Sequence, residues 1–507
     1  MSADISESGL RLQPVDDLLT QHPFGNSDYT SRQLRIAYRR RLAKIASQLP
    51  VAAELLNELR SVDDMQQHHI LGDTVLRCAV DHALVQVSAG RAYGLPLARC
   101  EELIADAVQY VRTHECGSPL SLPLARTLDA SGDNCWVWDE EHAEDNFARA
   151  FLHLVEDHYG GRPTTPSDAE YAILRQGVSL LGDLLPKSSS SALTHTRIVT
   201  IVPAEGAWTT TNSSSEYRLG GTIFLSRRLL SSPWRVAEFL FHETLHQQMY
   251  DFRQGHSLLS LDFERPDAPT ILSLWNVPGN NEWDIHRALA AFHVYVHLGL
   301  LASLAEQRKS ELERRYDAPL QMTSSRTALS RAQYLGNKIH ESSWDELGDA
   351  GKSFVDWFNS VIDYVDSDPP PKGSYIHLLL DRYLREASSV ESRISNGNGY
   401  ASATANMFAA LRDSEIKSVR SLLVSVNAAS VVRLFDDKVS AIAASSADPS
   451  IIANSASQFV QVRRAVASAI STITPNGYEI SRSRIPDEAF WQIVERSSAT
   501  LISALAK

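Results

Sequence analysis

The sequence HETLH at positions 242–246 combines two histidines and a glutamate at a spacing that suits metal chemistry. Residues four apart lie on one face of an α-helix, so His242 and His246 can present two imidazoles to the same ion. Glu243 lies beside them, where its carboxylate can reach a metal-bound water or orient a ligand. We therefore predict a metal-binding helix with Glu243 as its catalytic residue.

A third ligand is expected from a second helix, predicted to begin near residue 281 and to continue past residue 301. In this segment five residues follow one another at helical spacing and share one stripe: Glu282, His286, Leu289, His293 and His297. Glu282 would complete a set of two histidines and one carboxylate, which binds zinc in peptidases and Fe(II) in oxygenases. His293 would give a three-histidine site instead, and His256 and Glu264 in the preceding loop are further candidates. We favour Glu282.

The flanking sequence supplies the elements that must position this motif. The β-branched run at 197–202 and the segment 217–226 predict two strands. Ser232 followed by Pro233 is typical of a helix start, with serine as the N-cap and proline in the first turn. We therefore predict a helix over 233–251, and the strand pair before it is the clear β signal of the chain.

Apolar residues at three- and four-residue spacing predict helices through most of the remaining chain. We expect a mainly α protein with a small β element, in which a zincin-like HExxH helix follows a short strand pair inside a large multi-helical body. The expected organisation is a disordered N-terminus at 1–13, a helical region at 14–186, a metal-site core at 192–305 and a C-terminal helical region at 306–507. A serine-rich linker at 187–191 separates the first helical region from the core.

The composition of the chain argues against several other classes of function. Its 507 residues carry a formal net charge of -13, which disfavours nonspecific binding to the phosphate backbone of nucleic acids. The four cysteines, Cys78, Cys100, Cys116 and Cys135, show no CxxC spacing, and so low a number indicates reduced thiols and a cytoplasmic protein. We expect neither a signal peptide nor a transmembrane helix, because the N-terminus is polar and no apolar run of about 18 residues occurs. The sequence does not indicate the oligomeric state.

Three segments around the motif resemble those of a known family. GTIFLS at 221–226, VAEFLFHETLHQQMY at 236–250 and RALAAFHVYVHLGL at 287–300 are similar to segments of the HExxH-type, 2-oxoglutarate-dependent peptide β-hydroxylases. In that family a GxIxLS-like strand precedes the HExxH helix, and a later helix carries a Tyr-x-His-Leu-Gly-like segment, matched here at 295–299. The resemblance covers about 220–300, roughly one-fifth of the chain.

The chain departs from the family pattern just before the second helix. The family often carries a Trp-Arg pair and an Arg-Pro pair there, whereas Trp275 is followed by Asn276 and the pair Arg265-Pro266 lies earlier. Arg287 is then the nearest basic residue for the distal carboxylate of 2-oxoglutarate, which needs a cation.

The resemblance implies an Fe(II)- and 2-oxoglutarate-dependent oxygenase that hydroxylates an amino-acid side chain on a peptide or carrier-protein-bound substrate in a biosynthetic pathway. His242, His246 and Glu282 would hold the iron. Arg287 would bind the keto acid, and Glu243 would orient a ligand. The same ligands suit Zn(II) in a peptidase or amide hydrolase that uses Glu243 as general base. A helical scaffold with an accidental motif is a third interpretation, and the shared ligand set leaves the two enzymatic interpretations open.

Overall fold

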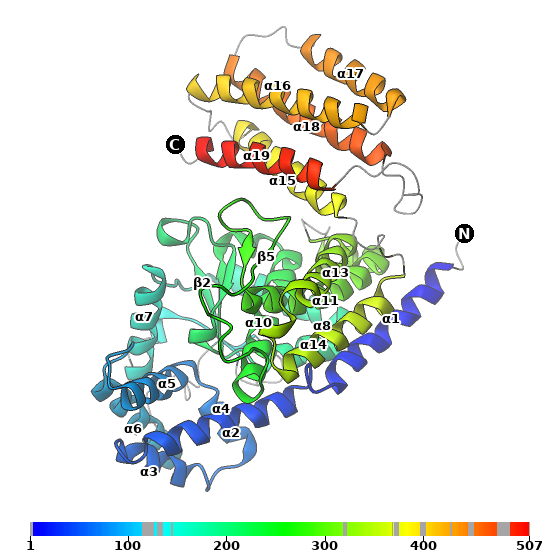
Figure 1. Cartoon of the computed structure of the whole chain (residues 1–507). Coiled ribbons are helices and arrows are strands. Elements are labelled where there is room, and N and C mark those ends of the chain that lie inside the picture. Colours follow the sequence, from blue (N-terminus) through cyan, green and yellow to red (C-terminus); the bar gives the residue numbers. More distant parts are fainter. Residues whose placement is uncertain are drawn as a thin grey trace. The chain divides into compact units, whose positions relative to one another are not determined.

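The computed structural model describes residues 4–113, 126–128, 135–142, 145–317, 322–367, 369, 375–395, 402–425, 428–444, 451–473 and 487–505. The chain is mainly helical, as predicted (Figure 1). Its residues fall into two compact units, each assembled from separate stretches of sequence. Unit 1 comprises Met1–Leu261, Leu289–Ala332 and Asp345–Val365, and unit 2 comprises Asp262–Ala288, Gln333–Trp344 and Asp366–Lys507.

Amphipathic helices form the first part of unit 1. They are α1 (Asp4–Gln21), α2 (Ser27–Ile45), α3 (Pro50–Glu58), α4 (Asp64–Leu71), α5 (Thr74–Ala89), α6 (Leu97–Thr113), α7 (Asn146–Tyr159), α8 (Asp168–Leu184) and α9 (Pro186–Leu193). Side chains cap their first free N–H groups: Asn26 accepts from Tyr29 in α2, and Ser167 with Glu170 forms a capping box at α8. The apolar faces of α2 to α7 meet in one core, in which Phe151 is fully buried.

Two segments in unit 1 differ from the expected organisation. Helix α1 begins at Asp4, inside the segment expected to be disordered, and the apolar face of its second half is buried. The serine-rich segment expected to be a linker is helix α9. Asp16 of α1 explains this helix, because its carboxylate accepts from the N–H groups of Lys187 and Ser188 in the first turn, at 2.9 and 2.8 Å.

Within the described residues of unit 1, a four-stranded mixed sheet lies next to the HExxH helix. Its strands are β1 (Trp136–Val137), β2 (Ile198–Val202), β3 (Ser213–Ser215) and β4 (Thr222–Ser226), in the order β1-β2-β4-β3. Strands β1, β2 and β4 are parallel, and β3 runs antiparallel to β4 at the edge. The strand predicted at 197–202 is confirmed as β2. Of the strand predicted at 217–226, only the second half is confirmed, as β4, because residues 217–219 form the turn η4 (Tyr217–Leu219). The side chains of β2 and β4 are buried on both faces.

The next helices along the chain are α10 (Pro233–Gly255), α11 (Ile285–Gln307), α12 (Lys309–Tyr316), α13 (Ser325–Ser342) and α14 (Asp349–Val365). Helices α10, α12 and α14 belong to unit 1, whereas α11 and α13 each contain residues of both units. Helix α10 contacts β3 and β4 as well as α2, α8 and α9. Among the described helices, α11 is the one long and apolar enough to cross a membrane, and 83% of its most apolar window is buried inside the structure. Such burial is typical of a helix in a protein core, so this finding is compatible with the expected absence of a membrane span.

Unit 2 contains the strand pair β5 (Ile271–Leu272) and β6 (Glu282–Trp283) and the helices α15 (Ile376–Ser395), α16 (Ser402–Ser425), α17 (Ala429–Ala444), α18 (Ile451–Ile473) and α19 (Asp487–Leu505). Helices α15, α16, α18 and α19 share an apolar core. Inside this bundle the buried Arg463 of α18 pairs with Glu386 of α15 at 2.7 Å and with Glu415 of α16 at 2.9 Å. A shift of one helix would leave a buried charge unpaired, so these ion pairs fix how the helices align.

Candidate metal centre

The start of α10 confirms the predicted helix boundary. Ser232 is the N-cap, its hydroxyl accepting from the Trp234 N–H at 3.3 Å, and Pro233 occupies the first turn. The buried indole of Trp234 donates to the carbonyls of Tyr316 and Asp317. The helix is therefore anchored at its first turn, eight residues before the first motif histidine.

Side chains directly after the motif attach α10 to the sheet and to the N-terminal helices. The amide of Gln247 accepts from the Gly221 N–H at 2.7 Å and donates to the Thr222 carbonyl at 3.0 Å, at the start of β4. Gly221 has a φ of +88°, in the left-handed region that favours glycine. Gln248 donates to the carbonyl of Gly25 at 3.2 Å. These bonds fix the rotation of α10, and with it the direction in which the motif side chains point.

A buried ionic network holds the second half of α10. Arg77 of α5 and His195, which follows α9, each contact one carboxylate oxygen of Asp251, at 2.7 and 2.9 Å. Burial alone would raise the pKa of Asp251, but the charge of Arg77 and the hydrogen bond from His195 hold it below its ordinary value. Removing one partner would leave a buried group uncompensated, so the network stabilises the position of α10.

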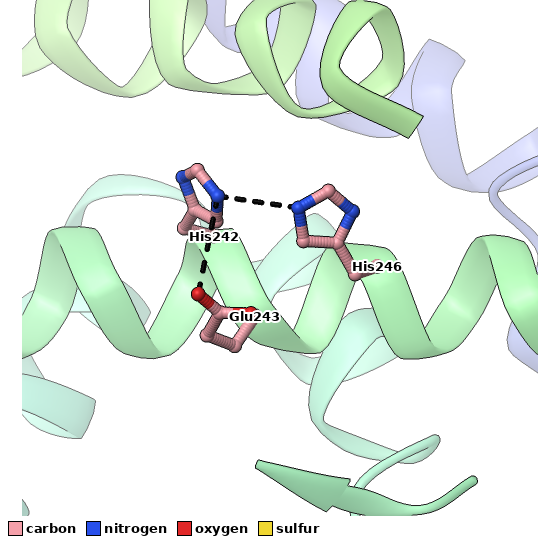
Figure 2. Close-up of side chains that lie close together, drawn as sticks. All are labelled: His242, Glu243 and His246. Atoms are coloured by element: carbon pink, nitrogen blue, oxygen red, sulfur yellow. Dashed lines mark hydrogen bonds and ion pairs between the residues drawn. The ribbon is translucent and has the colours of Figure 1, made fainter. Parts of the chain in front are cut away.

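The two motif histidines converge as a pair of metal ligands would. Their Nε2 atoms lie 3.2 Å apart, and Figure 2 shows both imidazoles on the same face of α10. Two nitrogens bound about 2.0–2.1 Å from one zinc ion at a near-tetrahedral angle are separated by about 3.2–3.4 Å. The side chain of His242 is 29% exposed, so an ion held here would be open to ligands from solvent. The residues present thus fit a divalent metal.

Glu243 is held from the edge strand. The hydroxyls of Ser213 and Ser215 donate to its two carboxylate oxygens, at 2.5 and 2.6 Å. One of these oxygens lies 3.9 Å from the Nε2 of His242, and one ligand atom from each of His242, Glu243 and His246 together lie within 4.8 Å of one another. Glu243 is 3% exposed. The carboxylate is therefore oriented by β3 while it stays close to the point on which the imidazoles converge.

Two further side chains extend the histidine face of α10 by one turn in each direction. The stripe consists of Glu238, His242, His246 and Tyr250. The buried Glu238 accepts from the Thr323 N–H at 3.0 Å, and burial raises its pKa. The ring of Tyr250 is stacked on that of His246 with centroids 6.0 Å apart, and burial, together with the charge of Glu243, raises the pKa of its phenol. Sequence reasoning missed both residues, although their four-residue spacing from the histidines could have found them.

Helix α11 places two buried imidazoles beside α10. His293 and His297 have ring centroids 4.6 Å apart, and His297 also lies 6.0 Å from the ring of Phe241. Burial above all, and then the charges of His297 and His246, hold the pKa of His293 well below its ordinary value. A backbone hydrogen bond with Leu245 acts against this shift. A neutral imidazole in this state is chemically suited to bind metal, and His293 stays a candidate third ligand.

Glu282 lies in β6, not at the start of the second helix. Asp284 accepts from the Arg287 N–H at 2.7 Å, as a helix cap does, and α11 therefore begins at Ile285. The prediction that Glu282 shares a helical stripe with the later histidines is wrong for this reason. Its carboxylate is exposed and, among the described residues, makes no hydrogen bond or ion pair. Glu282 belongs to unit 2 and the motif to unit 1, so its part in the metal site stays a prediction.

Arg287, the predicted keto-acid ligand, makes its contacts within unit 2. Its Nη1 donates to the side-chain oxygen of Asn280 at 2.9 Å, and its guanidinium lies over the ring of Trp283, 4.8 Å from the centroid. This guanidinium therefore already has partners, and its role towards 2-oxoglutarate stays a prediction.

The remaining ligand candidates lie at the end of α10 and beyond it. His256 stacks on Phe252 with ring centroids 4.3 Å apart, and its Nε2 lies 3.1 Å from the hydroxyl of Tyr29. These contacts give His256 a place in the packing of unit 1. His286 is half-buried and Glu264 is exposed, both in unit 2. Of the predicted residues, the structure brings together His242, Glu243 and His246, all from one motif.

The comparisons with known proteins add no family to this geometry. No protein-family model matches the chain, and no curated protein matches it either. The candidate metal centre therefore rests on the side chains of α10 and β3 and on their arrangement.

Proposed function

We propose that this chain is a non-haem Fe(II) oxygenase that uses 2-oxoglutarate to hydroxylate an amino-acid side chain on a peptide or carrier-bound substrate. The observation that carries the proposal is the geometry of α10, where two imidazole nitrogens converge while Glu243 is anchored to β3 through both oxygens. The resemblance of segments 221–226, 236–250 and 287–300 to the peptide β-hydroxylases supports the same activity.

The anchoring of Glu243 favours the oxygenase over a hydrolase. In a zinc hydrolase with this motif, the glutamate takes a proton from the metal-bound water. Here the hydroxyls of Ser213 and Ser215 already donate to both carboxylate oxygens. A carboxylate held in this way suits the orientation of a group at the metal, which is the part expected of a neighbour of the ligands in an oxygenase.

His242 and His246 would hold the iron, and Glu282 is the proposed carboxylate that completes a set of two histidines and one carboxylate. With O₂ and 2-oxoglutarate, iron in such a set supplies an oxidant strong enough to attack an unactivated C–H bond. The chain itself binds and orients the reactants. The carboxylate of Glu243, which accepts from two serines of β3, would orient a group at the metal on the side of the site next to this strand.

The distal carboxylate of 2-oxoglutarate requires a cation. Besides Arg287, unit 1 offers Arg331 of α13. Its Nη1 donates to the hydroxyl of Tyr295 at 3.1 Å, and its charge acts on Glu238, one turn before His242. We therefore propose Arg331 as a second candidate for this contact. Arg331→Gln and Arg287→Gln form a matched pair, and the variant that weakens 2-oxoglutarate binding identifies the residue.

A zinc hydrolase is the second candidate function. It is favoured by the closeness of the Glu243 carboxylate to His242 and His246, with ligand atoms within 4.8 Å of one another. At this distance a carboxylate can act as general base towards a water on a metal bound by the two histidines. In that case the serine hydroxyls of β3 would only orient the base.

Metal content and co-substrate use separate the two candidates. The protein would be purified without added metal, analysed, stripped, and reloaded with Fe(II) or Zn(II). We expect the Fe(II) form to consume 2-oxoglutarate and O₂ and to release succinate, slowly even without its substrate. The double variant His242→Ala/His246→Ala should release none. Equal succinate release by that variant, or full-rate turnover of a peptide amide by the anaerobic Zn(II) form without keto acid, would overturn the proposal.

A further inference from the structure

A cavity of about 190 Å³ lies in unit 1 between α5, α7 and the turn η4 (Tyr217–Leu219), and none of the residues that line it belongs to the metal centre. A buried water needs about 10–15 Å³ of such volume, so the cavity has room for a small organic molecule of roughly ten non-hydrogen atoms. It is smaller than the clefts of about 300–1,000 Å³ that hold drug-sized ligands. The size therefore points to a small metabolite.

His82 of α5 is a buried, oriented hydrogen-bond donor in the cavity wall. It is 8% exposed, and its Nδ1 accepts from the Leu95 N–H at 3.0 Å. Because Nδ1 accepts this bond, the ring carries its proton on Nε2, and burial lowers the pKa of His82. Within the described residues Nε2 makes no hydrogen bond. Gly94, with a φ of +57°, lies against the ring, and a Cβ at this position would collide with it.

One arginine and one carboxylate border the cavity. Arg218 of η4 and Asp157 of α7 are both exposed, and within the described part of the chain neither side chain makes a hydrogen bond or ion pair. After Asp81, which raises the pKa of His82, Arg218 lowers it and Asp157 raises it, so both rim charges lie near the same imidazole. The rest of the wall consists of the buried side chains of Leu95, Leu154 and Leu219 together with Tyr93, His153 and His158.

We propose that this cavity binds a free α-amino acid with an apolar side chain. Its carboxylate would pair with Arg218 and accept from the Nε2–H of His82, and its ammonium group would pair with Asp157. The side chain would cover the leucines. A zwitterion can pair with both rim charges, whereas an acid or an amine can pair with one only, so a zwitterion makes more charge-assisted contacts with the wall. The site needs no metal and does not depend on the proposed oxygenase activity.

Calorimetric titration of the metal-free, full-length chain tests the proposal. The probes are L-leucine, 4-methylpentanoate, which lacks the ammonium group, and 3-methylbutylamine, which lacks the carboxylate. We expect saturable binding of L-leucine at millimolar or lower concentration and at least about tenfold weaker binding of both analogues, because each loses a charge-assisted contact. Equal binding of either analogue, or no binding of L-leucine or any other apolar amino acid, would overturn the proposal.

Variants of the exposed rim complete the test without disturbing the core. Arg218→Gln and Asp157→Asn should each weaken L-leucine binding by at least about tenfold. Arg175→Gln removes an exposed arginine of α8 that does not line the cavity and should bind as the wild type does. Circular dichroism confirms that each variant is folded. Wild-type affinity in both rim variants would show that the charges do not recognise the ligand.

Discussion

Replacing the two serines that hold Glu243 tests the proposed role of this carboxylate. The variants are Ser213→Ala, Ser215→Ala and the double variant, compared with Glu243→Gln. Ser214→Ala is the matched control, because the hydroxyl of this middle serine lies 2.9 Å from that of Tyr159 and does not contact Glu243. The control therefore removes a hydroxyl from β3 without changing the partners of the carboxylate.

The expected loss in the free energy of unfolding follows from the two hydrogen bonds to Glu243 and from the burial of its carboxylate. Each serine donates one bond, of 2.5 or 2.6 Å, to a charged group that is 3% exposed. A hydrogen bond to a charged group contributes about 1.5–3 kcal/mol, so each single variant should lose about that much free energy of unfolding. The double variant leaves the buried carboxylate without either hydroxyl and should lose more than each single variant. Adding Glu243→Gln to it removes the buried charge and should restore part of the loss.

Urea denaturation of the metal-free protein measures these losses, and succinate release by the Fe(II) form measures activity. If Glu243 acts by orienting a group at the metal, the double serine variant and Glu243→Gln should both reduce turnover by about 10–100-fold. This is the usual loss when a residue that orients a metal ligand is replaced. The combined variant should be no slower than Glu243→Gln alone. The reasoning is refuted if the double serine variant keeps the wild-type rate while Glu243→Gln abolishes activity, because the carboxylate would then act by itself.

Three further outcomes are expected. The double variant His242→Ala/His246→Ala should keep its helical circular dichroism but contain no metal by elemental mass spectrometry; full metal content would show that the ion binds elsewhere. Glu282→Ala should weaken metal affinity in competition with a chelator more than His293→Ala does, and the reverse order would indicate a three-histidine site. Burial lowers the pKa of His297 from its ordinary 6.5 to about 4. Between these two pH values the imidazole is protonated in the unfolded chain and neutral in the folded chain. His297 should therefore contribute a loss of about 1.4 kcal/mol in the free energy of unfolding per pH unit as the pH falls from about 6.5 towards 4, beside the losses from His68 and His293, whose pKa values are also lowered. His297→Leu should make the pH dependence shallower by this amount, and identical pH dependence of urea unfolding in the variant and the wild type would contradict the assignment.

The parts of the fold that depend on local sequence were predictable. The start of α10 follows from Ser232 and Pro233, and β2 and β4 follow from their β-branched and apolar residues. Strand β3 consists of three serines, which have no strong preference for a strand, and it forms because β4 supplies its pairing partner. Helix α9 likewise depends on a cap from Asp16, about 170 residues away, which no window of local sequence contains.

The same distinction applies to the metal centre. The pairing of His242 and His246 follows from helical spacing alone, and the structure bears it out. The bonds from Ser213 and Ser215 to Glu243 depend on how an edge strand lies against α10, so periodicity could not reveal them. The position of Glu282 was predicted wrongly because the helical spacing of the histidines extends back in the sequence to Glu282, before α11 begins at Ile285.

The attachments of α10 also bear on how the protein is made. Asp251 pairs with Arg77, which is synthesised long before the motif, whereas Glu238 accepts from the N–H of Thr323, which is synthesised well after it. A chain leaving the ribosome N-terminus first has the early partner in place while the late one is still missing. Ordering of the first turns of α10, and of the two histidines that follow them, should therefore be completed only after this late segment has emerged.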